Sequence, residues 1–339
     1  MATIDDIAKK LHVSKGTVSK ALNGAPDIGE TMRKSILEAA VEMGYTKPLR
    51  RNDSPQFCIF VDGMKYEKPG DFGYDIIIGF RKMAEPAGCK VVLQQLDTQF
   101  REENPSYDGF MLEHNFIGAL FLDLHLSDPW LNQLHTSRTP AVLLDNYVKQ
   151  NPTTTYIGTD NNEAMYLVVE HLKNLGHQKI GYLSGTPNAY VNRERYDAFF
   201  RALQQHGLPA NIKQGSKSEL LIENLRTDFP RLLNEGVTAI MCSHDLLANA
   251  LMIHCHDLGI RIPEDLSIVG FDDLPICDYT IPPMTTIRQD RSQIGKSAYY
   301  ALSSLANGIC ISTLLLHPKL ICRQSTGRVP PHPPALDFP

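Results

Sequence analysis

Residues 1–23, MATIDDIAKKLHVSKGTVSKALN, contain two short amphipathic helical patterns joined by a tight turn. Thr3 is a residue type that caps helix N-termini, and Asp6 stands three residues later, at the spacing of a capping box. Apolar side chains follow at the spacing of one helical face, namely Ile4, Ile7, Ala8 and Leu11. This stretch therefore predicts a first short helix.

The second pattern begins after the turn at His12-Val13, where Ser14 is another N-cap residue type. One flank of the following helix is apolar, with Val18, Ala21 and Leu22, and the other flank carries Lys15, Thr17, Ser19 and Lys20. Two short helices of which the second exposes small polar and basic side chains form the geometry that enters a DNA major groove. The alternative is an ordinary helical hairpin with solvated lysines.

The phrase at residues 14–23, Ser-Lys-Gly-Thr-Val-Ser-Lys-Ala-Leu-Asn, closely resembles the S-x-x-T-V-S-x-x-L-N pattern of the LacI/GalR family of bacterial repressors. The resemblance continues along the chain. It covers Asp160-Asn161, Glu170-His171-Leu172, residues 175–180, 183–185, 259–273 and 283–287, and the stretch 320–326. Only a linker after the N-terminal helices and a proline-rich tail depart from it.

A third helix is predicted over about residues 30–43, and Gly44 would end it. Three helices define an all-α headpiece at residues 1–46. Gly29 stands where the family often has a serine or threonine cap, so a side-chain acceptor is missing there.

Residues 47–56 form a polar, basic segment between prolines, which we interpret as a hinge or linker. The resemblance implies a hinge helix whose leucine enters the minor groove, but the family's Ala-Arg-x-Leu phrase is absent here. Leu49 would supply the apolar wedge, and Arg50 and Arg51 the minor-groove or phosphate contacts. A simple basic tether is the alternative.

The charge is unevenly distributed along the 339 residues. Residues 1–51 hold nine Lys and Arg against six Asp and Glu, whereas residues 52–339 hold 24 against 32. A basic head on an acidic body is expected when only the head meets phosphates.

Seven scattered cysteines without a C-x-x-C pair indicate reduced thiols and neither disulfides nor a zinc site. His254-Cys255-His256 is the nearest approach to a metal cluster, but adjacent helical residues point in different directions. We expect no metal and no cofactor. Because the chain lacks a membrane-length apolar run and a signal peptide, we expect a cytoplasmic protein that does not bind membranes.

From Phe57 onward, short apolar strand runs, such as residues 118–122 and 239–242, alternate with helical patterns, such as residues 74–87 and 219–235. This alternation implies parallel sheets covered on both faces, and roughly ten strand runs favour two lobes over one. We expect an α/β body of two doubly wound parallel-sheet lobes, similar to periplasmic binding proteins, at residues 57–329. It would bind an effector and form the dimer. Residues 330–339 are expected to be disordered.

The match to the family motif assigns base reading to Lys15, Gly16 and Lys20. It assigns phosphate anchoring to Ser14, Thr17, Ser19 and Asn23. Lysine can donate to guanine O6 and N7, while hydroxyls and helix N-terminal amides suit phosphates, so the residue types agree with these roles.

Polar residues that follow strand runs are candidates for binding a small solute between the two lobes, because parallel sheets gather such groups at their carboxyl ends. The resemblance selects Phe72, Asp145, Asp160, Arg195, His244 and Asp272 as effector-binding residues. For Asp160, Asp245 and Asp273, a role as helix cap or turn former is an equal alternative. His244 stands where the family has an asparagine, so no ligand identity carries over.

The predicted function is a transcriptional regulator, a repressor, that binds a pseudo-palindromic DNA operator as a homodimer. A small polar effector, a sugar, sugar phosphate or nucleoside, would control it allosterically. A stand-alone solute-binding protein is the alternative. An enzyme is not expected, because the phosphate-loop, dinucleotide-binding, nucleophile-elbow and zinc-protease motifs are absent.

Overall fold

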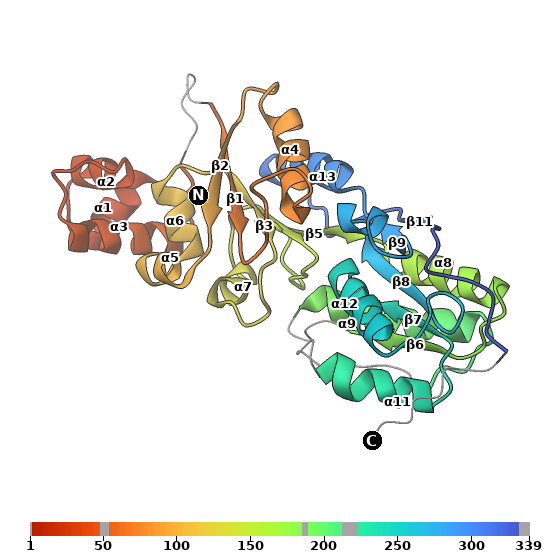
Figure 1. Ribbon diagram of the computed structural model, residues 1–339. Coiled ribbons are helices and arrows are strands. Elements are labelled where there is room, and N and C mark those ends of the chain that lie inside the picture. Colours follow the sequence, from red (N-terminus) through yellow and green to blue (C-terminus); the bar gives the residue numbers. More distant parts are fainter. Residues whose placement is uncertain (1, 48–53, 185–188, 212–222, 332–339) are drawn as a thin grey trace. The chain divides into compact units, whose positions relative to one another are not determined.

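The computed structural model describes residues 2–47, 54–184, 189–211 and 223–331 (Figure 1). The chain divides into two compact units. Unit 1 comprises Met1–Tyr66, Asp75–Ile157 and Ser292–Leu314, and unit 2 comprises Glu67–Tyr74, Gly158–Arg291 and Leu315–Pro339. Leu49, Arg50 and Arg51 of the predicted hinge lie outside the described residues, as does most of the predicted tail.

The headpiece consists of α1 (Ile4–Leu11), α2 (Lys15–Leu22) and α3 (Glu30–Glu42), which confirms the three predicted helices. A complete capping box begins α1: the Asp6 amide donates to Thr3 Oγ1 over 3.3 Å, and the Thr3 amide donates to Asp6 Oδ2 over 2.9 Å. The headpiece core is fully enclosed. It contains Ile7, Ala8, Val18, Ala21, Leu22, Ile36, Ala39 and Ala40.

Unit 1 contains most of a six-stranded sheet in the order β10-β5-β4-β3-β1-β2. The pairs from β2 across to β5 are parallel. The strands are β1 (Gln56–Val61), β2 (Lys90–Gln95), β3 (Gly118–Leu122), β4 (Ala141–Leu144), β5 (Thr154–Thr159) and β10 (Thr313–Leu316).

Helices cover both faces of this sheet (Figure 1). They are α4 (Phe72–Ala84), α5 (Thr98–Glu103), α6 (Tyr107–Glu113), α7 (Pro129–Leu134) and α13 (Arg291–Ala306). On one face, Phe60 of β1 meets Trp130 of α7 edge to face at 5.2 Å between ring centroids. On the other face, α4 and α13 touch backbone to backbone, because a Cβ on Gly295 would lie 1.9 Å from the Ile76 carbonyl oxygen.

Unit 2 contains a five-stranded sheet in the order β11-β9-β8-β7-β6. Its strands are β6 (Ile180–Leu183), β7 (Ala239–Cys242), β8 (Ser267–Asp272), β9 (Thr285–Arg288) and β11 (Lys319–Ile321). All neighbours are parallel except β11, which runs antiparallel to β9 at the edge. The helical segments are α8 (Asn161–Asn174), α9 (Tyr190–Gln205), η2 (Asn224–Asp228), α11 (Phe229–Asn234), α12 (Asp245–Asp257) and η3 (Pro275–Asp278).

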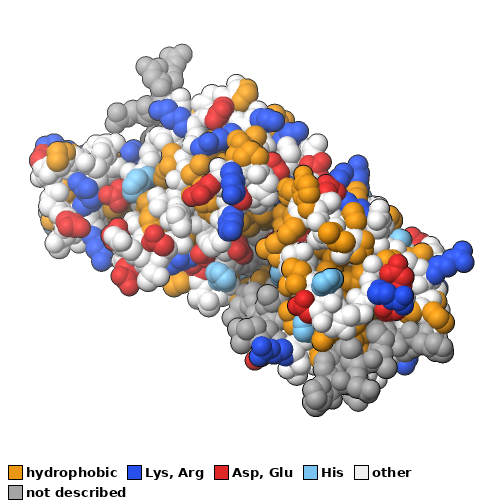
Figure 2. Space-filling model, in the orientation of Figure 1, with side chains coloured by type: hydrophobic (Ala, Val, Ile, Leu, Met, Phe, Trp, Pro, Cys, Tyr) orange, Lys and Arg blue, Asp and Glu red, His pale blue; other side chains and the backbone are white. Residues whose placement is uncertain are grey.

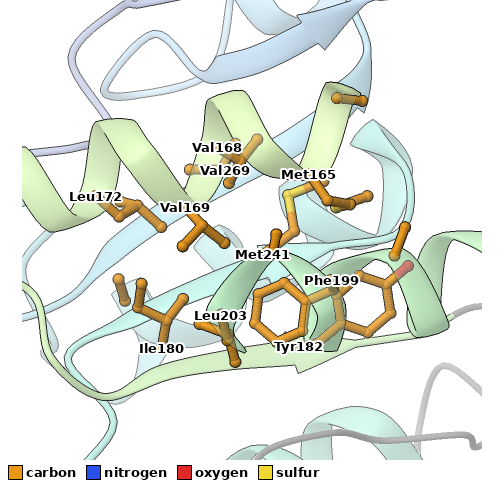
Figure 3. Close-up of a cluster of buried hydrophobic side chains, with 14 of the residues drawn as sticks. Met165, Val168, Val169, Leu172, Ile180, Tyr182, Phe199, Leu203, Met241 and Val269 are labelled. Atoms are coloured by element: carbon orange, nitrogen blue, oxygen red, sulfur yellow. The ribbon is translucent and has the colours of Figure 1, made fainter. Parts of the chain in front are cut away.

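The core of unit 2 lies on both sides of its sheet. One cluster joins α8 and α9 to the strands through side chains such as Met165, Val169, Tyr182, Phe199 and Met241 (Figure 3). A second cluster joins α11 and α12 to the opposite face. The doubly wound, two-lobed α/β fold predicted from the sequence is therefore confirmed.

Several element ends differ from the prediction. The helix predicted to run from Tyr74 to Ala87 ends at Ala84, since Pro86 has no amide to continue the helical hydrogen bonds. The helix predicted over residues 219–235 is, in its described part, a π-helical turn at η2 followed by α11. The sequence analysis also missed the short helices α5, α6 and α7 and, near the end of the chain, β9, α13, β10 and β11.

Candidate DNA-binding surface and effector site

The α2 helix presents its polar flank to solvent and its apolar flank to the headpiece core. Ser14 caps the helix, with the Thr17 amide donating to Ser14 Oγ over 3.0 Å. Val18, Ala21 and Leu22 are buried, while Ser14, Lys15, Gly16, Lys20 and Asn23 are exposed and Thr17 and Ser19 are half-buried. The seven headpiece residues predicted to contact DNA therefore belong to one accessible flank, and their roles on DNA stay predictions.

Each of the two predicted base-reading lysines lies against a carboxylate of another element. Lys15 Nζ is 2.5 Å from Asp5 Oδ2 of α1, and Lys20 Nζ is 2.5 Å from Asp27 Oδ2 in the turn before α3. The hydrogen bond from Lys20 is the first cause that holds the pKa of Asp27 below its usual value. The sequence analysis paired neither aspartate with a lysine, because the pairing depends on how the three helices pack.

The start of α3 lacks the side-chain cap that the family resemblance would supply. Gly29 is the N-cap residue and makes no side-chain hydrogen bond. After α3, Lys47 Nζ donates to the Leu22 carbonyl over 3.1 Å and connects the end of the headpiece to α2.

In unit 2, Arg195 is a buried cation held by three elements. Its side chain is on α9, Nε donates to Asn161 Oδ1 over 3.2 Å, and Nη1 donates to the Ser243 carbonyl over 2.9 Å. Its guanidinium carbon also lies 3.7 Å from the centroid of the Phe271 ring, a cation–π contact. The residue is 4% exposed, so its direction is set by the fold.

Asp272, the last residue of β8, is a buried carboxylate that Arg195 stabilises electrostatically. Gln289 Nε2 donates to Asp272 Oδ1 over 2.7 Å, and Thr159 Oγ1 donates to Gln289 Oε1 over 2.7 Å. Burial raises the pKa of Asp272, and the Arg195 charge and the Gln289 hydrogen bond oppose that rise. Its φ of 117° is a backbone conformation that non-glycine residues rarely adopt, which is a feature of ligand sites.

His244 caps α12 through its ring. Nδ1 accepts from the Leu247 amide over 3.1 Å, so the proton of the neutral ring is on Nε2. Burial, with help from the Arg195 charge, lowers the pKa of His244 to about 4. At neutral pH this residue is therefore an uncharged ring with its N–H donor on Nε2.

The three aspartates for which two roles were open each make contacts that stabilise the fold. Asp160 caps α8 by accepting from the amides of Asn162 and Glu163. Asp245 is the first residue of α12 and accepts from Thr286 Oγ1 over 2.6 Å and the Leu274 amide over 2.7 Å. Asp273 pairs with Arg288 and Arg323.

The six predicted effector residues do not all lie in one unit. Arg195, His244, Asp272 and Asp160 belong to unit 2. Phe72 also belongs to it, with the Arg291 guanidinium carbon 5.8 Å from its ring centroid. Asp145 belongs to unit 1 and follows β4 with a φ of 53°.

The sequence reading missed Asn161, Gln289 and Phe271, which hold Arg195 and Asp272 in place. Asn161 was visible in the Asp160-Asn161 phrase, but Gln289 follows a strand that the pattern did not reveal. Among the described residues, no group of three His, Cys, Asp or Glu side chains could hold a metal ion. Within the same residues, no helix has both the length and the apolarity that a membrane crossing requires.

Comparison with known proteins gives two family matches along the chain. Residues 3–47 match the model for bacterial regulatory proteins of the lacI family, and residues 169–326 match the periplasmic binding protein-like domain. The regulator MalR of Streptomyces coelicolor is 28% identical over 334 residues, which covers 96% of both chains.

Solved structures agree with the fold at lower identity. The regulator CelR in complex with cellobiose is 24% identical with a TM-score of 0.67, covering 96% of this chain and 100% of that one. The lac repressor dimer bound to operator and an anti-inducer is also 24% identical, with a TM-score of 0.65 and coverage of 96% and 99%. The helix-turn-helix headpiece, the two-lobed body and these matches agree: the chain combines a helix-turn-helix domain of the lacI family of bacterial regulatory proteins with a periplasmic binding protein-like domain.

Proposed function

We propose that this DNA-binding transcriptional regulator is a cytoplasmic repressor that binds a pseudo-palindromic operator as a homodimer and responds to a sugar or sugar derivative. The class itself, a regulator and not an enzyme, follows from the lacI-family match and from the curated relatives. That match also favours a regulator over a stand-alone solute-binding protein. The observation that carries the finer proposal is the burial of a cation and a carboxylate at the end of β8, where Arg195 lies against the Phe271 ring and Asp272 is the next residue.

Operator binding is proposed for α2, whose first turn would meet base edges in the major groove. Its exposed lysines can donate to guanine, and its hydroxyls can donate to phosphates. We also keep Leu49, Arg50 and Arg51 as proposed hinge contacts from the sequence.

The effector is proposed to be a polyhydroxylated solute, because unit 2 offers both acceptors and donors. Asp272 presents a carboxylate, Arg195 a fixed cation and His244 the N–H of its neutral ring. Paired hydroxyl groups donate to a carboxylate and accept from such donors at once. The solved relative CelR is in complex with cellobiose, a sugar, which agrees with this class.

Homodimerisation is proposed through an exposed apolar surface of unit 2, which we call the α12 face and which consists of Leu246, Ile253, Tyr279 and Ile281. Leu246 and Ile253 are seven residues apart on α12, on one helical face, and are 58% and 56% exposed. Tyr279 and Ile281 follow η3, which packs on α12, and are 82% and 94% exposed. Hydrophobic side chains are exposed on the side of unit 2 seen in Figure 2.

A second copy of the chain suits the α12 face because a twofold pair presents two headpieces to two half-sites. The Ile281→Asp variant should shift the protein from dimer to monomer in sedimentation velocity. Ile309→Asp is the matched control, because Ile309 is 59% exposed and belongs to unit 1. Equal dimerisation of both variants would mean that the α12 face is not the interface.

Operator binding is tested by selecting DNA from a random duplex library with the full chain at one stated salt concentration. We expect an enriched pseudo-palindrome with half-sites about one helical turn apart. If no sequence is enriched, with or without candidate sugars, the proposed operator function is wrong.

The effector site is tested with Asp272→Asn. Sugars, sugar phosphates and nucleosides are screened for a shift in thermal unfolding of the full chain and then for a change in operator affinity. The variant should bind the effector about 10 to 100-fold more weakly, because a hydrogen bond to a charged group is lost. Asp197→Asn on the exposed side of α9 is the control with the same charge change. A normal response of Asp272→Asn would show that Asp272 is structural.

A further inference from the structure

The headpiece neutralises its two proposed base-reading lysines before any DNA is present. Lys15 is 67% and its partner Asp5 40% exposed in their side chains, and Lys20 and Asp27 are 58% and 54% exposed. The first pair connects α2 to α1, and the second connects α2 to the turn before α3. On the side of the headpiece seen in Figure 2, basic and acidic side chains are interspersed and form no continuous basic patch.

Exposed ion pairs of this kind contribute little to stability, typically up to about 1 kcal/mol. These ion pairs have a stronger influence on the affinity for DNA than on stability. Non-specific affinity comes from lysine and arginine side chains that replace counterions at phosphates. A lysine whose ammonium already contacts a carboxylate gains less from a phosphate, and the carboxylate itself repels the phosphate. These pairs therefore weaken binding to DNA of arbitrary sequence.

A G·C base pair has hydrogen-bonding partners for both members of a lysine–aspartate pair. Guanine presents two acceptors, O6 and N7, to a lysine, and the paired cytosine presents an N4 amino donor that a carboxylate can accept. A lysine–aspartate pair holds one donor and one acceptor side by side, so both members can find a partner on one G·C edge. The phosphate backbone satisfies only the lysine.

We propose that Asp5 and Asp27 are specificity-determining residues, which restrain Lys15 and Lys20 on non-specific DNA and release them at G·C pairs of the operator. This inference rests on the proposed operator function of α2. It adds to that function two acidic residues outside the recognition helix.

The headpiece contains a matched control. Lys10 Nζ lies 2.6 Å from Glu42 Oε2, in a pair that joins α1 to α3 and includes no residue of α2. Glu42→Gln removes one negative charge and frees one lysine, as Asp5→Asn and Asp27→Asn each do. A general effect of headpiece charge would therefore appear equally in all three variants.

The experiment measures binding of the full chain to a random-sequence duplex and to the selected operator at several salt concentrations. Asp5→Asn and Asp27→Asn should bind the random duplex more tightly and steepen the plot of log affinity against log salt by about 0.9 for each freed lysine. From 50 to 200 mM salt, that slope means a further loss of about 3.5-fold in affinity for each freed lysine. The ratio of operator to random affinity should fall, and Glu42→Gln should change the ratio much less.

Repeating the selection with all three variants gives an independent readout, since a G·C position of each half-site should lose enrichment with Asp5→Asn and with Asp27→Asn but not with Glu42→Gln. Equal behaviour of Asp27→Asn, Asp5→Asn and Glu42→Gln in both assays would overturn the inference while leaving operator binding intact. If the wild-type chain enriches no sequence, the proposed operator function fails instead, so the two failures are distinguishable.

Discussion

The headpiece and unit 2 place their candidate residues in opposite environments. The residues of α2 that we propose to contact DNA are exposed or half-buried, and the two lysines among them pair with aspartates of the same three-helix headpiece. Arg195 and Asp272 are buried at 4% and 9% exposure and are held by Asn161, Ser243 and Gln289 from other elements. Exposed residues can change their partners when DNA arrives, whereas buried ones are already oriented. The first region suits exchangeable contacts and the second suits a preorganised ligand site.

The largest expected effect is that of Arg195→Ala on the free energy of unfolding. Removing the guanidinium takes the Arg195 charge away from the buried Asp272 carboxylate and leaves the Ser243 carbonyl without its donor, which costs about 3 to 5 kcal/mol. Urea unfolding monitored by tyrosine and tryptophan fluorescence measures this change. Arg201→Ala on the same helix is the control, because Arg201 is exposed and its Nε donates to Asn162 Oδ1 over 3.0 Å. Similar losses in both variants would contradict the contrast between the two regions.

Lys20→Ala should weaken operator binding and leave the free energy of unfolding almost unchanged. Base discrimination should fall by about 1 to 3 kcal/mol at one position of each half-site, because one donor to guanine is lost. The free energy of unfolding should change by no more than about 0.5 kcal/mol, since the side chain is exposed. Lys15→Ala is expected to behave in the same way. Unchanged sequence preference in both variants would remove the assignment of base reading to α2.

The smallest expected effect concerns pH and His244. Because its pKa is about 4 in the fold and near 6.5 when unfolded, the unfolded chain takes up a proton below pH 6.5 that the folded chain does not. Its contribution to stability is therefore complete above pH 6.5 and is lost as the pH falls toward 4. At pH 5.5 this loss is about 1.4 kcal/mol.

The variant His244→Asn isolates that contribution. Asparagine keeps an acceptor for the Leu247 amide and has no titratable group. The stability of the wild type relative to the variant should fall by about 1.4 kcal/mol between pH 7.5 and 5.5, measured by urea unfolding at each pH. Other titrating groups are common to both chains and cancel in the difference. A constant difference would mean that His244 titrates normally in the fold.

The local sequence pattern was sufficient to predict those helix starts and strands that depend on residues close together in the chain. Thr3 with Asp6, Ser14 with Thr17, and Asp160 with the two amides that follow it are contacts over two or three residues, so the helix starts were readable. Buried strands such as β3 and β7 were visible as apolar runs with the bounds observed. The segment from β9 to β11 was not readable, because its strands are short and half-polar and its partners are distant in sequence.

The sequence by itself determined the headpiece helices, the alternation that builds two doubly wound lobes, and the residue types offered to DNA and to an effector. Those properties follow from periodicity and capping, which act within a few residues. The tertiary structure alone decided which groups meet: Asp5 with Lys15, Asp27 with Lys20, and Gln289 with Asp272. It also decided the tautomer and the low pKa of His244. Pairing, burial and electrostatic shifts depend on distances between elements, and these distances exist only once the chain has folded.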